Sequence, residues 1–313
     1  MSVTSVLATG LGWIEKHFTV CFSVAVLWGV FLPAYARVFD SDGVKYALVV
    51  VLTFSFLKID LAEILGHVRR PLLLSYALVM NLAVMPALTF VAALACGPET
   101  RLGLVMLVAM PTGVAAAAIC GMVGGSTGLT LLLCVLSSLL APLTIPGVLY
   151  VLFGANVAIE YGSLFLTLFF LIAVPLVVSQ LVKRLMKRVA ETVKTRGGGV
   201  SVLILCCIIM SVISSQAAFI RENVGDVLGI LAALYVTFVA LQFVSYVMGF
   251  RLARNEKLAL SVSKTIMNNA LGIVVATQFF PESPRVALVL ILSEIPWSTV
   301  PALYRFYKKR LTR

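Results

Sequence analysis

The sequence has few charged residues and almost no histidine. Only 12% of its 313 residues are charged, with 13 acidic residues and 2 histidines. A soluble globular chain carries about twice that share of charge. An enzyme embedded in a membrane would need a cluster of His or Asp inside its apolar segments. The two histidines, His17 and His67, lie at the edges of such segments, so we expect no enzyme.

Metal-ligand spacing is also missing. The six cysteines all lie within apolar stretches, and no histidine lies near a pair of them. Cysteines in such places behave as small buried hydrophobic residues. The pattern predicts neither a metal site nor a cofactor.

Long apolar runs are abundant instead. The hydrophobic fraction is 61%, and runs of about 18 residues or more are long enough to cross about 30 Å of hydrocarbon. We expect an all-α integral membrane protein with ten transmembrane helices. Their predicted limits are 17–34, 45–59, 71–96, 101–122, 127–153, 159–182, 199–219, 226–250, 257–280 and 285–304.

The positive charges follow the expected topology. A net charge of +11 on a soluble protein would suggest nucleic acid, but here Lys and Arg lie between the apolar spans. With the N-terminus inside, eighteen of the 24 basic residues fall on the inner side, five on the outer side, and Lys264 within a span. This bias indicates an even number of spans with both termini cytoplasmic. We expect a bacterial inner (plasma) membrane protein whose surroundings are the lipid bilayer and not nucleic acid.

Two spans are interrupted by residues that weaken a helix. The fourth, 101–122, contains Pro111 and Gly113, and the ninth, 257–280, contains Lys264, Asn268 and Asn269. The interruptions lie about half the chain apart. The pairing indicates two five-helix repeats, 1–156 and 157–313, and repeats with an odd number of spans are inverted relative to each other. Interrupted helices at matching positions of inverted repeats predict a binding site near the bilayer midplane. Taken singly, Pro111 need only kink a helix and Gly113 need only allow close packing.

Three segments carry a family resemblance. They are LKIDLAEILGHVRRPLLLSYALVMNLAVMPAL, PTGVAAAAICGMVGGSTGLTLLLCVLSSLLAPLTIP and SKTIMNNALGIVVA. With them the chain resembles the bile acid:sodium symporter family, in the broad sense that includes bacterial organic-anion carriers. The resemblance implies discontinuous crossing helices four and nine. It also implies a panel domain of helices 1, 2, 6 and 7 that moves against a core domain of helices 3–5 and 8–10.

The sodium ligands that the resemblance implies are largely replaced. The family's Ser and Asn after the first crossing fall at Ala116 and Ala117, and its Ser and Thr on helix five fall at Thr130 and Cys134. Sodium needs several oxygen ligands, and an alanine side chain has none. The resemblance therefore implies that one sodium site is lost.

The second sodium site is altered as well. The family's Glu of helix nine falls at Lys264, its Gln at Asn268, and its Asn is kept as Asn269, while the Gln of helix three falls at Asn81. An ammonium at this place would repel a sodium ion. Buried amides need partners, so these three Asn residues also fit a role as contacts between helices.

Three roles fit Lys264. It can act as a tethered cation where sodium would bind, it can exchange a proton and couple transport to it, or it can be structural. A structural Lys264 would either extend to the inner interface or pair with Glu294 in the tenth span. Placing an ammonium inside the membrane costs at least about 2.5–3.5 kcal/mol, which favours a function.

The sequence favours a secondary transporter that moves a small organic anion by alternating access, with Lys264 in place of a sodium ligand and no dependence on sodium. A sodium-coupled symporter of the same substrates remains open, as does an arsenite exporter of the same fold, for which Cys120 is the nearest thiol. A channel is the alternative from another class. The expected substrate and ion site comprises Lys264, Asn268, Asn269, Asn81, Pro111, Thr112, Gly113, Thr130 and Glu294.

Overall fold

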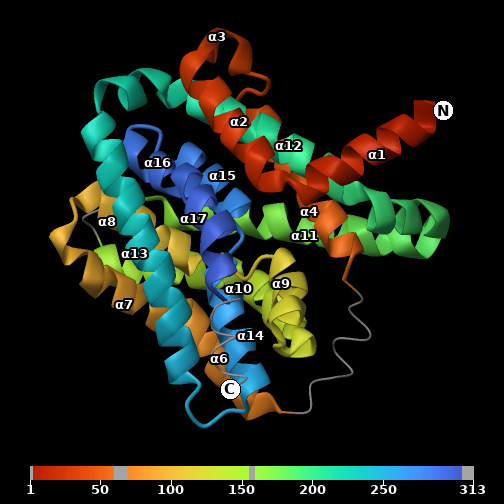
Figure 1. Cartoon of the computed structure of the whole chain (residues 1–313). Coiled ribbons are helices and arrows are strands. Elements are labelled where there is room, and N and C mark those ends of the chain that lie inside the picture. Colours follow the sequence, from red (N-terminus) through yellow and green to blue (C-terminus); the bar gives the residue numbers. More distant parts are fainter. Residues whose placement is uncertain (1–2, 60–69, 155–158, 305–313) are drawn as a thin grey trace. The chain divides into compact units, whose positions relative to one another are not determined.

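The computed structural model describes residues 3–59, 70–154 and 159–304, with side chains from residue 10 onward except that of Ser41. His67, one of the residues considered above, lies outside this range. The described residues are helical, with short connections and one isolated β-bridge, and contain no named strand (Figure 1). The all-α class is therefore confirmed.

The described chain divides into two compact units. The first unit comprises Met1–Asp60 and Phe170–Val224, and the second comprises Leu61–Phe169 and Gly225–Arg313. The ends of the chain thus belong to different units, and each unit is assembled from two separate segments of sequence. The repeat boundaries expected at 156 and 157 stay a prediction.

The first unit is built around one long helix. Its elements are α1 (Val3–Lys16), α2 (Phe18–Phe31), α3 (Pro33–Ala36), α4 (Ser41–Leu57), most of α11 (Tyr161–Leu185) and α12 (Lys187–Glu222). Helix α12 packs along α2, α4, α3 and α1. The pair formed by Gly10–Lys16 and α2 bends by 87°, so α1 does not continue the direction of α2.

The second unit contains the remaining helices. They are α6 (Pro71–Val79), a π-helical turn η1 (Met80–Val84), α7 (Met85–Ala92), η2 (Ala93–Ala95), α8 (Pro98–Ala109), α9 (Ala115–Val123), α10 (Thr127–Phe153), α13 (Val224–Met248), α14 (Arg254–Thr265), α15 (Asn269–Phe279), α16 (Pro284–Leu292), α17 (Glu294–Thr299) and η4 (Val300–Ala302). Helix α8 packs against α16 and α7, and α14 packs against α9 and α10. The core of this unit is therefore formed around the interrupted helices.

Six helices in the described part are long and apolar enough to cross a membrane, and the bent pair around His17 would be a seventh. These spans are Pro71–Ala95, Thr127–Phe153, Tyr161–Leu185, Lys187–Glu222, Val224–Met248 and Pro284–Ala302. The predicted fourth and ninth spans are each divided into two shorter helices, so neither contributes one long apolar helix. The count of ten spans and the inverted repeats stay predictions.

One predicted boundary is wrong. The seventh span was predicted to begin at residue 199, which leaves Gly197 and Gly198 in a connection, but Gly197–Gly199 all lie inside α12, which begins at Lys187. The three glycines are buried beneath α1, and a Cβ atom on Gly199 would overlap the backbone carbonyl of Leu11. Close packing of two helix backbones therefore explains a glycine run that, by propensity alone, ends a helix.

We predict that Gly199→Ala lowers the free energy of unfolding by about 1–3 kcal/mol, the usual cost of overpacking. The added methyl group meets a backbone atom, which cannot rotate away as a side chain would. Denaturant unfolding of the purified protein in detergent measures the change.

Gly12→Ala in α1 is the matched control, because no atom lies within 4 Å of its added Cβ. Its stability should equal or slightly exceed that of the wild type, since alanine favours a helix more than glycine does. Equal stability of Gly199→Ala and wild type would contradict the packing described here.

Candidate functional site

Both interrupted spans are broken where the sequence predicts. Helix α8 ends at Ala109 and α9 begins at Ala115, so Pro111 and Gly113 lie in the break. Helix α14 ends at Thr265 and α15 begins at Asn269. Each break exposes the carbonyl end of one half-helix and the amide end of the next. Inside a membrane these groups must be satisfied by protein, ligand or water.

The two breaks pair with each other through their backbones. Thr112 and Met267 form an antiparallel bridge. The amide of Gly113 donates to the carbonyl of Ile266 at 2.8 Å, and the amide of Asn268 donates to the carbonyl of Pro111 at 2.8 Å. The pairing satisfies polar groups that each break alone would leave exposed to hydrocarbon.

Gly113 is required by this close approach. A Cβ atom on it would lie 2.9 Å from the carbonyl oxygen of Met267 and 3.2 Å from its carbonyl carbon. Both are backbone atoms, so the two breaks would have to separate to admit any side chain. Gly113 was predicted as a site residue from its place in the first break. Its contact with the backbone of the second break explains why a glycine is needed there.

Three side chains hold the paired breaks. The hydroxyl of Ser137 on α10 accepts from the amide of Thr112 at 3.1 Å, and the hydroxyl of Thr112 donates to the carbonyl of Ser263 at 3.0 Å. The indole Nε1 of Trp297 donates to the carbonyl of Met267 at 3.2 Å. Ser137 and Trp297 are not among the site residues that the sequence predicted. Their polar atoms inside apolar spans were the available signal.

Lys264 lies at the centre of this arrangement. Its side chain is only 1% exposed. Its Nζ donates to the carbonyl of Asn81 at 2.7 Å and also to the carbonyl of Val108. Val108 is in the last turn of α8, and Lys264 itself is in the last turn of α14. The ammonium therefore lies at the negative ends of two half-helix dipoles.

Asn81 offers its carbonyl from the π-helical turn η1. A π-helical turn changes the usual i to i+4 bonding, and such turns are frequent at functional sites. The carbonyls of Asn81 in η1 and of Val108 in α8 both accept from the Lys264 side chain. Two elements of the second unit therefore meet at this residue.

The contacts of Lys264 differ from the two structural arrangements considered for it above. The ammonium is buried and bonded to two backbone carbonyls, so it does not extend to an interface. No ion pair among the described residues joins it to Glu294. That carboxyl group begins α17 and is 8% exposed. The Lys264 side chain instead extends from the end of α14 to carbonyls of α8 and η1.

Several buried polar atoms near the breaks have no hydrogen-bond partner among the described residues. They are Nδ2 of Asn81, Oγ of Ser263, and both Nδ2 and Oδ1 of Asn269. The neighbouring Asn268 is different, because its Oδ1 caps α15 by accepting from the amide of Leu271 at 3.3 Å. Buried amides are almost always hydrogen-bonded, so unpartnered ones indicate a place for a bound polar ligand or water.

Thr130 is separate from this group in its contacts. Its hydroxyl is fully buried and donates to the carbonyl of Ser126 in its own helix at 3.0 Å. Ala116, where the family resemblance implies a sodium ligand, is also fully buried. The loss of the first of the two implied sodium sites therefore stays a prediction.

Comparison with known proteins adds evidence on the family of the chain. A family model described as the Sodium Bile acid symporter family matches residues 46–223, which is more than half of the chain. The chain belongs to this family. It is also 27% identical over 225 residues to an uncharacterized sodium-dependent transporter, YocS, of Bacillus subtilis (strain 168). That match covers 68% of this chain and 67% of the relative.

Membership of the Sodium Bile acid symporter family makes the chain a membrane transporter and not an enzyme. A transporter of this family has a small-molecule substrate and is itself embedded in the lipid bilayer. The name of the relative includes sodium dependence, whereas in this chain the Lys264 side chain donates to carbonyls of η1 and α8. The coupling ion is therefore the main functional question.

We predict that Ser137→Ala destabilises the protein by about 1–3 kcal/mol, because it leaves the buried amide of Thr112 without a partner. Ser138→Ala is the control. The hydroxyl of Ser138 donates only to the carbonyl of Cys134 in its own helix. Denaturant unfolding of both variants should therefore show a clear loss for the first and a small one for the second. Similar losses for the two would argue against a role of Ser137 in holding the break.

Proposed function

We propose that this protein is a secondary transporter of a small organic anion, in which the ammonium of Lys264 replaces the sodium ion. The observation that carries the proposal is the bonding of Nζ to the carbonyls of Asn81 and Val108. A cation fixed to the chain supplies the positive charge that these carbonyl ends need. It does so without an ion gradient, so transport is independent of sodium.

The charge of the site supports an anionic substrate. The breaks expose the amide ends of α9 and α15, and helix amide ends attract negative charge. The side-chain amide of Asn269, which has no hydrogen-bond partner among the described residues, lies in the first turn of α15. Lys264 adds a cationic side chain beside the carbonyl end of α8. No carboxylate among the described residues forms an ion pair with it.

The two compact units suggest how the substrate crosses. We assign the first unit to the panel and the second unit to the core, which contains both broken helices. Movement of one unit against the other would alternate access to the site. The proposed setting is a bacterial plasma membrane with both chain termini in the cytoplasm, as the distribution of Lys and Arg indicates.

Sodium-coupled symport is the second candidate function. It is favoured by the name of the Bacillus relative, a sodium-dependent transporter. In that case sodium would be bound by backbone carbonyls and by the amides of Asn268 and Asn269, beside the ammonium. The two candidates differ in a measurable property, which is saturable sodium binding.

We predict that purified wild-type protein shows no saturable binding of radioactive sodium and that Lys264→Glu gains it. The substitution replaces the ammonium by a carboxylate, the type of ligand that sodium requires. A scintillation proximity assay measures the binding. Lys257→Glu is the matched control, because Lys257 lies in the first turn of the same helix, over the ring of Tyr246. This variant should bind no sodium.

A thermal-shift screen with small organic acids, supplied as sodium and as choline salts, then identifies the substrate for uptake into proteoliposomes. We expect at least one acid to stabilise the wild type equally in both salts. Stabilisation by neutral solutes alone would reject the anionic substrate. Sodium-stimulated uptake, or saturable sodium binding by the wild type, would reject the replacement of sodium by Lys264.

A further inference from the structure

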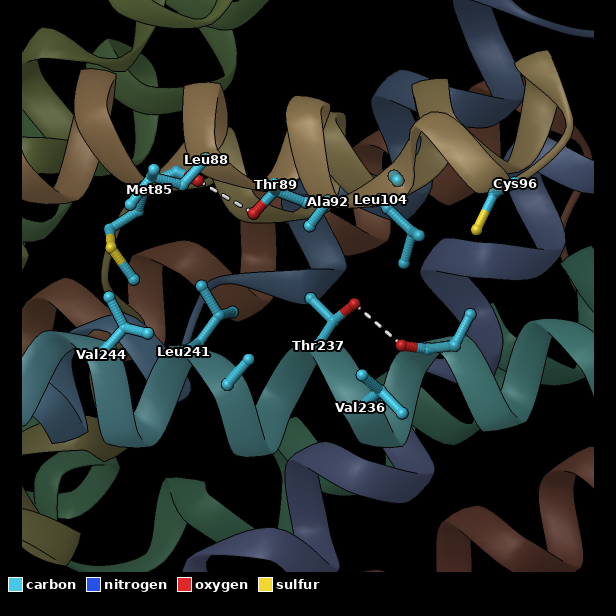
Figure 2. Close-up of a pocket in the computed structure, with 13 residues that line it drawn as sticks. Met85, Leu88, Thr89, Ala92, Cys96, Leu104, Val236, Thr237, Leu241 and Val244 are labelled. Carbon is cyan, nitrogen blue, oxygen red and sulfur yellow. Dashed lines mark hydrogen bonds between the residues drawn. The ribbon is translucent and has the colours of Figure 1, made fainter.

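The second unit has an apolar groove between α7 and α13 (Figure 2). Its volume is about 420 Å³, and its lining is aliphatic and small, as at Met85, Ala240 and Leu241. Two hydroxyl groups line it, but Thr89 donates to the carbonyl of Met85 and Thr237 to that of Ala233 within their own helices. The groove therefore presents no free hydroxyl donor and favours an apolar occupant.

The groove leads to a second cavity of a different character. This cavity has a volume of about 600 Å³, and Cys96 and Ala233 line both cavities. The charged residues of its lining lie in the first turns of three helices: Glu99 of α8, Asp226 of α13 and Arg285 of α16. The apolar groove thus ends at a charged cluster.

The charges of this cluster suit an amine. Arg285 donates to the carboxylates of Glu99, at 3.5 Å, and of Asp226. The lining therefore has two carboxylates for one guanidinium, and two carboxylates offer more acceptor positions than Arg285 uses. The three side chains are between 34% and 44% exposed, so a ligand can reach them.

The length of the groove matches one leaflet of a bilayer. Its lining on α13 runs from Ala233 to Val244, which corresponds to about 16 Å at the helical rise of 1.5 Å per residue. Half of the hydrocarbon thickness of a bilayer is about 15 Å. An acyl chain that enters the groove at Ala233 would therefore reach about the middle of the membrane, and the headgroup would extend from there towards Asp226.

We propose that this combined surface is a binding site for one phospholipid with an ethanolamine headgroup. One acyl chain lies in the groove between α7 and α13, and the primary ammonium of the headgroup donates to Glu99 and Asp226. A glycerol headgroup has no ammonium. A choline headgroup has no N–H to donate. The site is separate from the broken helices and does not depend on the proposed transport function.

Native mass spectrometry tests the proposal on the full chain. The protein is purified from micelles that contain equal amounts of phosphatidylethanolamine, phosphatidylglycerol and phosphatidylcholine with the same acyl chains. We expect one phosphatidylethanolamine molecule to be retained about tenfold more than either other lipid, as charge-assisted hydrogen bonds would give. Equal retention of the three lipids would overturn the proposal.

Two kinds of variant separate the groove from the cluster. Ala240→Phe fills the groove and should reduce retention of all three lipids. Ala232→Phe on the same helix is the control, because Ala232 is exposed but does not line the groove. Glu99→Gln with Asp226→Asn should leave binding but remove the preference for ethanolamine. Retention unchanged by Ala240→Phe, or a preference unchanged by the double variant, would also overturn the proposal.

Discussion

The ammonium of Lys264 bonded to the carbonyls of Asn81 and Val108 is the interaction on which the broken-helix core depends. Carbonyl groups at the end of a half-helix have no partner in their own helix, and hydrocarbon offers none. One side chain satisfies carbonyls from η1 and α8 while it extends from the end of α14. Burying this charge costs free energy. Removing the ammonium, however, would leave those carbonyls without their hydrogen-bond donor. The same contact therefore joins three elements of the second unit and sets the electrostatics of the site.

The pairing of the two breaks completes this arrangement. Thr112 and Met267 place the breaks side by side, and Gly113 allows the approach because it has no Cβ. The carbonyl end of α8 then contacts the Lys264 side chain, whereas the amide end of α15 is capped in part by the side chain of Asn268. Under the proposed function, the ammonium takes the place of a sodium ion. This proposal agrees with the alanines at positions 116 and 117, where the family resemblance implies sodium ligands.

The sequence predicted the parts of the structure that follow from local chemistry. Pro111 cannot donate a backbone hydrogen bond, so the break in the fourth span could be predicted. An ammonium inside an apolar span needs partners, so Lys264 could be selected as a candidate site residue. The partners of Lys264 were not, because they are backbone carbonyls that any residue type supplies. Gly197 and Gly198 were left outside the predicted span, since only the packing of the glycines against α1 reveals why glycine is needed inside α12. Ser137 and Trp297 were missed because their hydrogen bonds join residues distant in sequence.

The central claim is that the chain itself supplies the cation at the carbonyl ends of the broken helices. Thallium(I) can stand in for a monovalent cation and is located directly by its anomalous scattering in crystals. The account predicts no thallium peak beside the carbonyl oxygens of Asn81 and Val108, with the density of the Lys264 side chain in contact with both. A thallium peak coordinated by these two oxygens, with the lysine side chain turned away, would contradict it.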